Sequence, residues 1–322
     1  MATQTIISHN DVETNRHEYI GASDIGTIMG VNPFKTPFEL WCEKTQKIKP
    51  KNLDDNDSVR MGKVLEEFVA QEYAYRHNCK VRRAPIVYVH PDYPFLKAHA
   101  DRLITGSEKG LECKTTSEFN KDKWKDADIP ESYILQCQFL MGLAKRNEWD
   151  IAVLIGGNKY KDKPLKFDKD LFDLCVEKAV HFWNYNVGQN IPPELTEDDD
   201  ETLKTLYSNH NEKFIELFPN DEKSTEAVMD FESAVANLQE MKMHKDNLEK
   251  DIKVEEAKIK DIIKDNVGIK TPKYVITWKT QNRSGIDTKL LKEEKPQIAK
   301  EYETVTSYRV MRITKNKECE VA

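Results

Sequence analysis

The run WDIAVLIGG at residues 149–157 constrains the fold more than any other segment of the chain. Its apolar and β-branched residues follow one another without the polar alternation of a half-exposed strand, and two glycines end the run. A strand of this composition is typically buried on both faces, as in a sheet that helices cover. The segment therefore predicts a buried strand in an α/β fold.

The segments before and after this run support an α/β arrangement. Apolar side chains recur at helical spacing in residues 16–78, whereas residues 79–115 hold three strand-like runs separated by HPDYP and TGSEKG, which are strong turn signals. Two further helices are expected in SYILQCQFLMGLAK and DKDLFDLCVEKAVHFWNYNV. The order of helix, three strands, helix and strand predicts a central sheet flanked by helices.

The C-terminal third of the chain is expected to be built differently. An acidic linker at residues 194–223 separates it from a domain at residues 1–193, and residues 224–265 contain neither Gly nor Pro and carry an imperfect apolar stripe. A helix of this length would measure on the order of 60 Å, and it either folds onto its own chain or forms an intermolecular coiled coil. YVITWKT and TSYRVMRIT are expected to pair behind it, so residues 224–322 form an interaction module.

Composition narrows the class of protein. Charged residues make up 33% of the chain and the net charge is −7, while basic clusters such as KYKDKPLK leave nucleic acid open as a partner. No run reaches the ~18 apolar residues of a membrane span. The N-terminus lacks the features of a signal peptide, so a cytoplasmic protein is expected. The six cysteines include no Cys-x-x-Cys pair, which argues against zinc ribbons and iron–sulfur clusters.

The segment GLECKT at residues 110–115 holds the main candidates for chemistry. In a strand, alternate side chains share a face, so Glu112 and Lys114 point the same way. A solvated edge strand with an ion pair would show the same pattern, and acid-x-Lys triplets also occur at residues 256–258, 287–289 and 293–295. The triplet by itself is therefore not specific.

The preceding segment separates this triplet from the others. FLKAHADRLI places Asp101 within an apolar strand, and a short turn leads into GLECKT, so Asp101 and Glu112 are expected to meet on a hairpin. Two such carboxylates repel each other unless a divalent cation neutralises them, and oxygen ligands favour Mg²⁺ or Mn²⁺ over zinc. Lys114 would orient a water or stabilise charge on a phosphate. Either Glu66 or Glu67, on an upstream helix, offers a third carboxylate.

In this order the pieces resemble the PD-(D/E)XK nuclease superfamily and, more narrowly, the lambda-exonuclease and YqaJ-like viral recombinase family. The matched segments span residues 16–157 and are GASDIGTIMGVNPFKTPFELWCEKT, MGKVLEEFV, APIVYVH, AHADRL, GLECKT and YILQCQFLMGL. No single segment is specific, but six in order are. The resemblance implies an α/β core with a central mixed sheet flanked by helices, to which this chain adds a long helix and a small β extension.

The resemblance also implies roles for individual residues. Asp101 and Glu112 match two metal-binding acids, and Glu66 rather than Glu67 matches the helical acid. The backbone carbonyl of Cys113 matches a further metal ligand. Lys114 matches the catalytic lysine, and Tyr133 and Gln136 match the Tyr and Gln of the next helix. Ser23 matches a serine near the terminal phosphate, and Arg16 matches an arginine that holds the 5′-phosphate.

One position leaves a choice, one departs from the family pattern, and one tryptophan is a candidate for contact with DNA. Gln138 is the alternative to Gln136 in the helix that follows GLECKT. Arg102 stands where the family usually has glycine, which keeps the ligands and places a cation near the phosphate path. The five tryptophans are expected to be core or rim aromatics, and Trp124, among the lysines of KDKWKD, is the one to test for stacking on DNA.

The implied activity is a Mg²⁺-dependent exonuclease, with Mn²⁺ as an alternative and two ions in the site. It would degrade linear double-stranded DNA from 5′ ends and leave 3′ overhangs for phage or prophage recombination. The implied partners are DNA ends, a RecT-like single-strand annealing protein, and two further copies of the chain in a ring. A structure-specific or restriction-like endonuclease and a non-catalytic recombination scaffold remain open alternatives.

Overall fold

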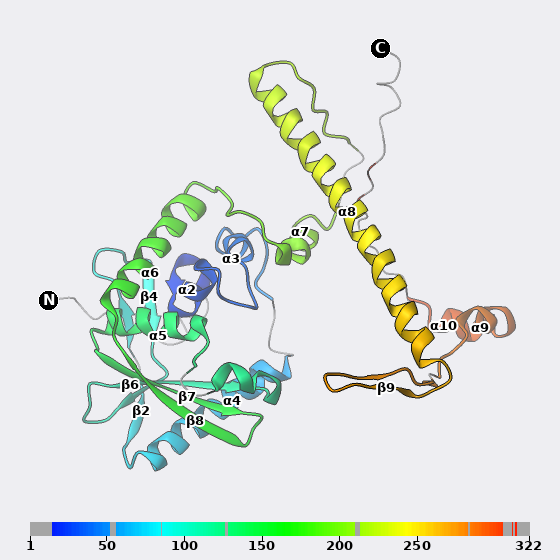
Figure 1. Ribbon diagram of the computed structural model, residues 1–322. Helices are drawn as coiled ribbons and strands as arrows, with labels where there is room; N and C mark the ends of the chain where they lie inside the picture. Colours follow the sequence, from blue (N-terminus) through cyan, green and yellow to red (C-terminus); the bar gives the residue numbers. More distant parts are fainter. Residues whose placement is uncertain are drawn as a thin grey trace. The chain divides into compact units, whose positions relative to one another are not determined.

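The protein is seen in a computed structural model that divides into two compact units, Met1–Ser208 and Asn209–Ala322, described separately below (Figure 1). The structure describes residues 15–51, 56–84, 86–125, 128–209, 213–282, 284–304, 311 and 313. Across this described part of the chain, no helix is both long enough and apolar enough to cross a membrane.

A five-stranded mixed sheet in the order β2-β5-β6-β7-β8 forms the centre of the first unit. β6 and β7 pair in parallel, and the other neighbours pair antiparallel. β7 is buried along nearly its whole length, as its apolar run predicts. The strands are β2 (Val81–Arg83), β5 (Arg102–Ile104), β6 (Gly110–Thr116), β7 (Glu148–Ile155) and β8 (Lys159–Lys166).

A second sheet of three short strands belongs to the same unit. In it β4 (Leu96–His99) lies between β1 (Ile20–Gly21) and β3 (Val87–Val89). The expectation that FLKAHADRLI is one strand is therefore wrong, because the chain bends at Asp101 and passes from this sheet to β5 of the larger one. The segment KVRRAPIVYVH divides between β2 and β3 for the same reason.

Helices cover both faces of the larger sheet (Figure 1). α4 (Asp57–Arg76) packs against β6 and β7 on one face, whereas α5 (Glu131–Ala144) lies on the other and packs against α2 (Ala22–Ile28) and α6 (Lys169–His181). This arrangement confirms the predicted α/β fold with a mixed sheet flanked by helices. The remaining helical segments of this unit are η1 (Arg16–Glu18), α3 (Pro37–Lys44), η2 (Glu118–Trp124), η3 (Phe182–Val187), η4 (Glu197–Asp199) and α7 (Asp200–Leu206).

The acidic stretch expected to be a linker contributes to the first unit. Asp199 is completely buried between η4 and α7, where it accepts hydrogen bonds from the hydroxyls of Thr36, at 2.5 Å, and Thr196, at 2.9 Å. A buried carboxylate with two such donors is a fixed part of a core. The first unit therefore continues to Ser208, beyond the end expected at residue 193.

The second unit contains α8 (Glu222–Ile263), a single helix of 42 residues that confirms the expected long helix (Figure 1). Asp221 begins it by accepting a hydrogen bond from the Ser224 amide at 2.7 Å. β9 (Gly268–Lys270) and β10 (Val275–Thr277) follow as an antiparallel pair, so the strand in YVITWKT pairs with a different segment than expected. Most of TSYRVMRIT lies outside the described residues. The unit also contains α9 (Thr288–Glu294) and α10 (Pro296–Glu301).

Candidate active site

β6 directs Glu112 and Lys114 toward the face of the sheet that α5 covers. The intervening Cys113 packs on the opposite face with residues of α4. Glu112 is only 1% exposed, and the Nζ of Lys114 lies 2.6 Å from its Oε1. Because β6 lies between β5 and β7, this ion pair is in the interior of the sheet, which excludes the solvated edge strand.

Gln136 of α5 holds the charged pair from above. Its Nε2 donates to Glu112 Oε1 at 2.6 Å, and its Oε1 accepts from Lys114 Nζ at 3.2 Å. One turn earlier on the same helix, the ring centre of Tyr133 lies 4.8 Å from Lys114 Nζ, a cation–π contact. Residues three apart share a face of a helix, which is why α5 presents both side chains to β6.

Gln138, the alternative to Gln136, has a different task. It is buried, its side-chain amide donates to the Lys166 carbonyl at 2.8 Å, and its side-chain oxygen accepts from the Asp168 amide at 2.9 Å. These bonds join α5 to the end of β8 and the beginning of α6. Gln136 is therefore the glutamine that contacts the charged pair.

Asp101 lies at the bend before β5, next to Glu112 across the β5–β6 hairpin. Its Oδ2 accepts a hydrogen bond from the Cys113 amide at 2.9 Å. Burial and the neighbouring carboxylate of Glu112 raise the pKa of Asp101 to about 8; Lys114 acts in the opposite direction, and Glu66 adds to the rise. The hairpin thus brings two mutually repelling carboxyl groups together, as the sequence predicts.

The donor set at this hairpin fits a divalent cation. Glu112 Oε2 is buried without a hydrogen-bond partner, which is costly for a carboxylate oxygen. A cation between Glu112 and Asp101 would satisfy that oxygen and remove the repulsion that raises the Asp101 pKa. These carboxylates and the carbonyl of Cys113 are the oxygen ligands that suit Mg²⁺ or Mn²⁺.

Arg102 determines where the third carboxylate lies. Its guanidinium binds Glu66 at 2.5 Å and Glu67 at 3.0 Å, and its side chain is 4% exposed. Glu66 therefore pairs with a cation of the chain. Among the described residues, no three His, Cys, Asp or Glu side chains form a group compact enough to hold a metal. Arg102, at the usual glycine position, forms ion pairs with Glu66 and Glu67 of α4, whereas the sequence predicted a cation near the phosphate path.

Arg16 and Ser23 lie together at the beginning of α2. Arg16 binds Asp24 at 2.7 Å and is within 3.3 Å of the Ser23 hydroxyl. The buried Lys44 donates to the other Asp24 oxygen at 2.9 Å. Burial acts to raise the pKa of Asp24, but Lys44 and Arg16 together lower it to about 2. Asp24 and Lys44 were not predicted as site residues from the sequence, because their role depends on contacts between separate helices.

A small cavity of about 100 Å³ connects this region with Gln136. Arg16 and Ser23 line it, together with Lys97 of β4. Lys97 was not predicted as a site residue, although period-2 alternation within LKAH indicates that Lys97 and His99 share the less buried face of the strand. The cavity thus joins the residues expected at a 5′-phosphate to Gln136, which binds the charged pair on β6.

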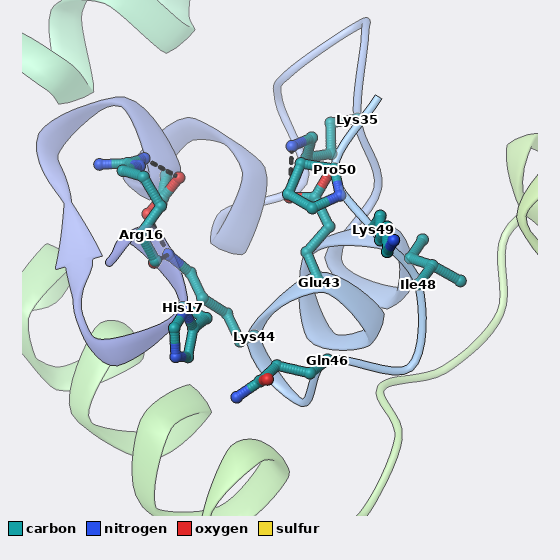
Figure 2. Close-up of a pocket in the computed structure, with 10 residues that line it drawn as sticks. Arg16, His17, Lys35, Glu43, Lys44, Gln46, Ile48, Lys49 and Pro50 are labelled. Atoms are coloured by element: carbon teal, nitrogen blue, oxygen red, sulfur yellow. Dashed lines mark hydrogen bonds and ion pairs between the residues drawn. The ribbon is translucent and has the colours of Figure 1, made fainter. Parts of the chain in front are cut away.

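A second pocket, of about 490 Å³, also includes Arg16. Figure 2 shows Arg16, His17 and Lys44 at one end of this pocket. At the other end Lys35 binds Glu43 at 2.6 Å. The Arg16 side chain therefore lines both pockets, and its ion pair with Asp24 fixes it there.

Trp124 does not offer a surface for DNA. It is 1% exposed, packs with apolar residues of β7, and its ring centre lies 5.8 Å from that of Tyr133. Trp124 is therefore a core aromatic, as expected for the tryptophans of this chain, and it is not available to stack on bases.

Two comparisons with known proteins identify the family. A profile of the YqaJ-like viral recombinase domain matches residues 13–147. The chain is also 34% identical over 314 residues to the "Uncharacterized protein YqaJ" of Bacillus subtilis (strain 168), covering 96% of this chain and 95% of that protein. The chain belongs to the YqaJ-like viral recombinase family. The resemblance carried by the six ordered segments is thereby confirmed.

The YqaJ-like chain also resembles solved structures at a low level. The alkaline exonuclease LHK-Exo from Laribacter hongkongensis has a TM-score of 0.48 and 17% identity, over 56% of this chain and 94% of that one. A phage related exonuclease from Haemophilus somnus 129PT has a TM-score of 0.42 and 12% identity, over 53% and 95%. Because these similarities are low, family membership rests on the profile and the Bacillus relative.

Proposed function

We propose that this YqaJ-like protein is a metal-dependent deoxyribonuclease that degrades linear double-stranded DNA from 5′ ends and leaves 3′ single-stranded overhangs for recombination. The observation that carries the proposal is the cluster of the buried Glu112 with the half-buried Asp101, Lys114 and Gln136. Two crowded carboxyl groups and a cation on one sheet face form a set suited to phosphodiester hydrolysis, which needs metal ligands and a charged donor.

The acidic residues would hold Mg²⁺, or Mn²⁺ in its place, and the proposal assigns two ions to the site. The ligands would be Asp101, Glu112 and the Cys113 carbonyl, with Glu66 as a further acid beside Arg102. Bound ions of this kind supply Lewis acidity at the scissile phosphate and lower the pKa of a water.

Lys114 would act as a donor. Burial acts to lower the pKa of Lys114, but Glu112 and Asp101 more than offset burial and raise it. The ammonium group therefore stays protonated at neutral pH and can stabilise negative charge that develops on the phosphate. Gln136 orients this group by binding both Lys114 and Glu112, and Tyr133 covers it from one side.

The preference for a 5′ end would come from Arg16 and Ser23. An arginine fork is well suited to a terminal phosphate, and the ion pair with Asp24 holds it in one orientation. Lys97 adds a second cation to the same cavity. A ring of three copies would retain the duplex without a strongly basic chain, and a RecT-like annealing protein would take up the overhang; these two assignments rest on family analogy.

The test compares two DNA substrates in the presence of Mg²⁺, Mn²⁺ or EDTA. A linear duplex with a 5′-phosphate, labelled on one strand at either end, should lose nucleotides from its 5′ termini only when metal is present. A closed circular duplex of the same sequence should stay intact.

Three other outcomes would contradict the proposal in different ways. Metal-dependent cutting of the circle would support the endonuclease. Release of label from 3′ ends first would refute the polarity. Binding of linear DNA without any digestion would support the non-catalytic scaffold.

A further inference from the structure

The long helix α8 carries an apolar face that the other described residues of the second unit leave exposed. Met241, Leu248, Ile252 and Ile262 are between 56% and 68% exposed. Apolar residues exposed in a row along one helix mark a surface that binds another protein segment. Because the row extends over much of the helix, the segment that binds it must be long, and a second helix meets that requirement.

Most of the apolar residues in this part of α8 are spaced as in a helix–helix seam, and Met243 and Val254 lie outside it. From Leu238 onward, seam positions recur in alternating steps of three and four residues, the spacing of a heptad repeat. Two of these positions are charged, Lys245 and Glu255, and the others are apolar. In order, the seam positions are 238, 241, 245, 248, 252, 255, 259 and 262.

The two charged positions identify the occupant. Lys245 and Glu255 lie equally far from Lys250 on either side. If two copies of α8 pair antiparallel about a two-fold axis at Lys250, Lys245 of each copy meets Glu255 of the other. The same register brings apolar residues together in three further layers: Leu248 with Ile252, Met241 with Ile259, and Leu238 with Ile262.

A parallel pair would be unfavourable. It would place Lys245 of one copy against Lys245 of the other, and Glu255 against Glu255, inside a seam where water screens charges poorly. Charged residues at seam positions are known to specify register and orientation in this way. The antiparallel pair converts both repulsions into attractions, and it uses the same surface of each copy, as two-fold symmetry requires.

We propose that residues 238–262 of α8 form an interaction surface for a second copy of this chain, which binds antiparallel. In the unpaired helix Lys245 lies 3.6 Å from Glu249, and Glu255 lies 2.6 Å from Lys258. These local ion pairs partly neutralise the seam charges before association. Near the two-fold axis the Glu249 side chains of the two copies approach each other, and the ion pair of each with Lys245 reduces their repulsion. The surface contains no residue assigned to the nuclease site.

Charge exchange in the full-length protein tests the pairing. Lys245→Glu and Glu255→Lys, each made alone, place like charges together at both ends of the pair and should weaken association at least about tenfold. The double variant only exchanges the two charges and should restore it. Lys250→Glu, the same charge change on the outer face of the helix, is the matched control.

Light scattering over a range of protein concentrations gives the readout. The unaltered protein should reach an even multiple of the chain mass, two chains alone or an even number if the first units also form a ring. A single chain, or an odd multiple that Lys245→Glu leaves unchanged, would overturn the proposal, because α8 would then fold onto its own chain or bind another protein. Failure of the double variant to restore association would also overturn it.

Cysteine cross-linking tests the orientation. Met241→Cys and Ile259→Cys variants, made separately and then mixed under oxidising conditions, should form disulfide-linked dimers. Each variant alone should not exceed the background of the parent chain, because these two positions meet only each other. Self-linkage of each variant alone would indicate a parallel pair and refute the proposed orientation. Digestion of linear DNA should be the same in all these variants, which separates this outcome from failure of the proposed activity.

Discussion

Lys114 is half-buried against the Tyr133 ring and beside two carboxyl groups, and its chemistry follows from those neighbours. The ion pair with Glu112, at 2.6 Å, keeps it charged despite burial. A lysine held in this way donates hydrogen bonds and stabilises anions, and it does not accept a proton from water. Its removal should therefore affect the rate of reaction more than the binding of DNA.

Replacing Lys114 with alanine is expected to lower the rate of digestion of linear duplex by about 100-fold or more, the usual cost of removing a donor aimed at developing charge. Initial rates in Mg²⁺ measure the effect, and a thermal melt checks that the variant is folded. Lys159→Ala removes an exposed lysine of β8 that binds Glu118, and should leave the rate unchanged. Equal rates for Lys114→Ala and the unaltered protein would contradict the assignment.

The two glutamines of α5 should differ in opposite ways. Gln136→Ala removes the contacts to Lys114 and Glu112, so the rate should fall by about tenfold or more while stability changes little. Gln138→Ala leaves the Asp168 amide and the Lys166 carbonyl unpaired, which should cost about 1–3 kcal/mol in the free energy of unfolding and leave the rate of the folded protein unchanged. Rates and urea melts of both variants measure the contrast, and the reverse pattern would favour Gln138 as the site residue.

Asp24 should make stability depend on pH in the acid range. Because its pKa is lowered from 3.8 to about 2, the folded state gains about 2 kcal/mol above pH 4, and this gain is lost as the pH falls toward 2. Asp24→Asn lacks this gain, so the difference in unfolding free energy between the two proteins should shrink from pH 7 to pH 2.5. Urea melts at several pH values measure it. A difference that stays constant would refute the role of the ion pairs.

The elements around the site differ in how well the sequence predicts them. β7 and α5 are predicted because their apolar residues are also the buried ones, whereas α4 is predicted from its apolar spacing although Val64 and Phe68 are exposed. The division of residues 95–104 between two sheets is not predicted, because the period-2 pattern continues through Asp101 while the pairing partners change. β8 was missed because KYKDKPLK is a half-exposed strand with few apolar residues, and only its pairing with β7 reveals it.

Arg102 joins β5 to α4 and should make stability depend on metal. Arg102→Gln removes the cation that binds Glu66 and Glu67 beside Asp101, which should cost about 3 kcal/mol when metal is chelated. Added Mg²⁺ should recover part of this loss by neutralising the same acids. The melting temperature in EDTA and in Mg²⁺ measures the effect. Arg83→Gln is the control, because Arg83 is exposed and also contacts Glu67. An equal loss in both conditions would argue against a cation at these acids.

The whole molecule combines two units with different origins of stability. The first has a large buried core and holds the residues of the candidate site, whereas in the second the other described residues leave α8 exposed along most of its length. The long helix was predictable from the sequence, since residues without Gly or Pro and with regular apolar spacing favour a helix. The end of the first unit was not, because Asp199 is buried by Thr36, which lies far away along the chain.

A chain that ends at Ser208 should separate the two proposals at the level of the molecule. It retains every residue assigned to the site and the buried core of the first unit, so it should unfold in one cooperative transition and still digest linear duplex in Mg²⁺. It lacks α8, so its mass in solution should no longer show the doubling that pairing of α8 produces. Single-turnover rates and light scattering on the same sample measure both properties. A folded, inactive fragment would show that the second unit takes part in the reaction, and an unchanged even-numbered mass would place the pairing surface on the first unit.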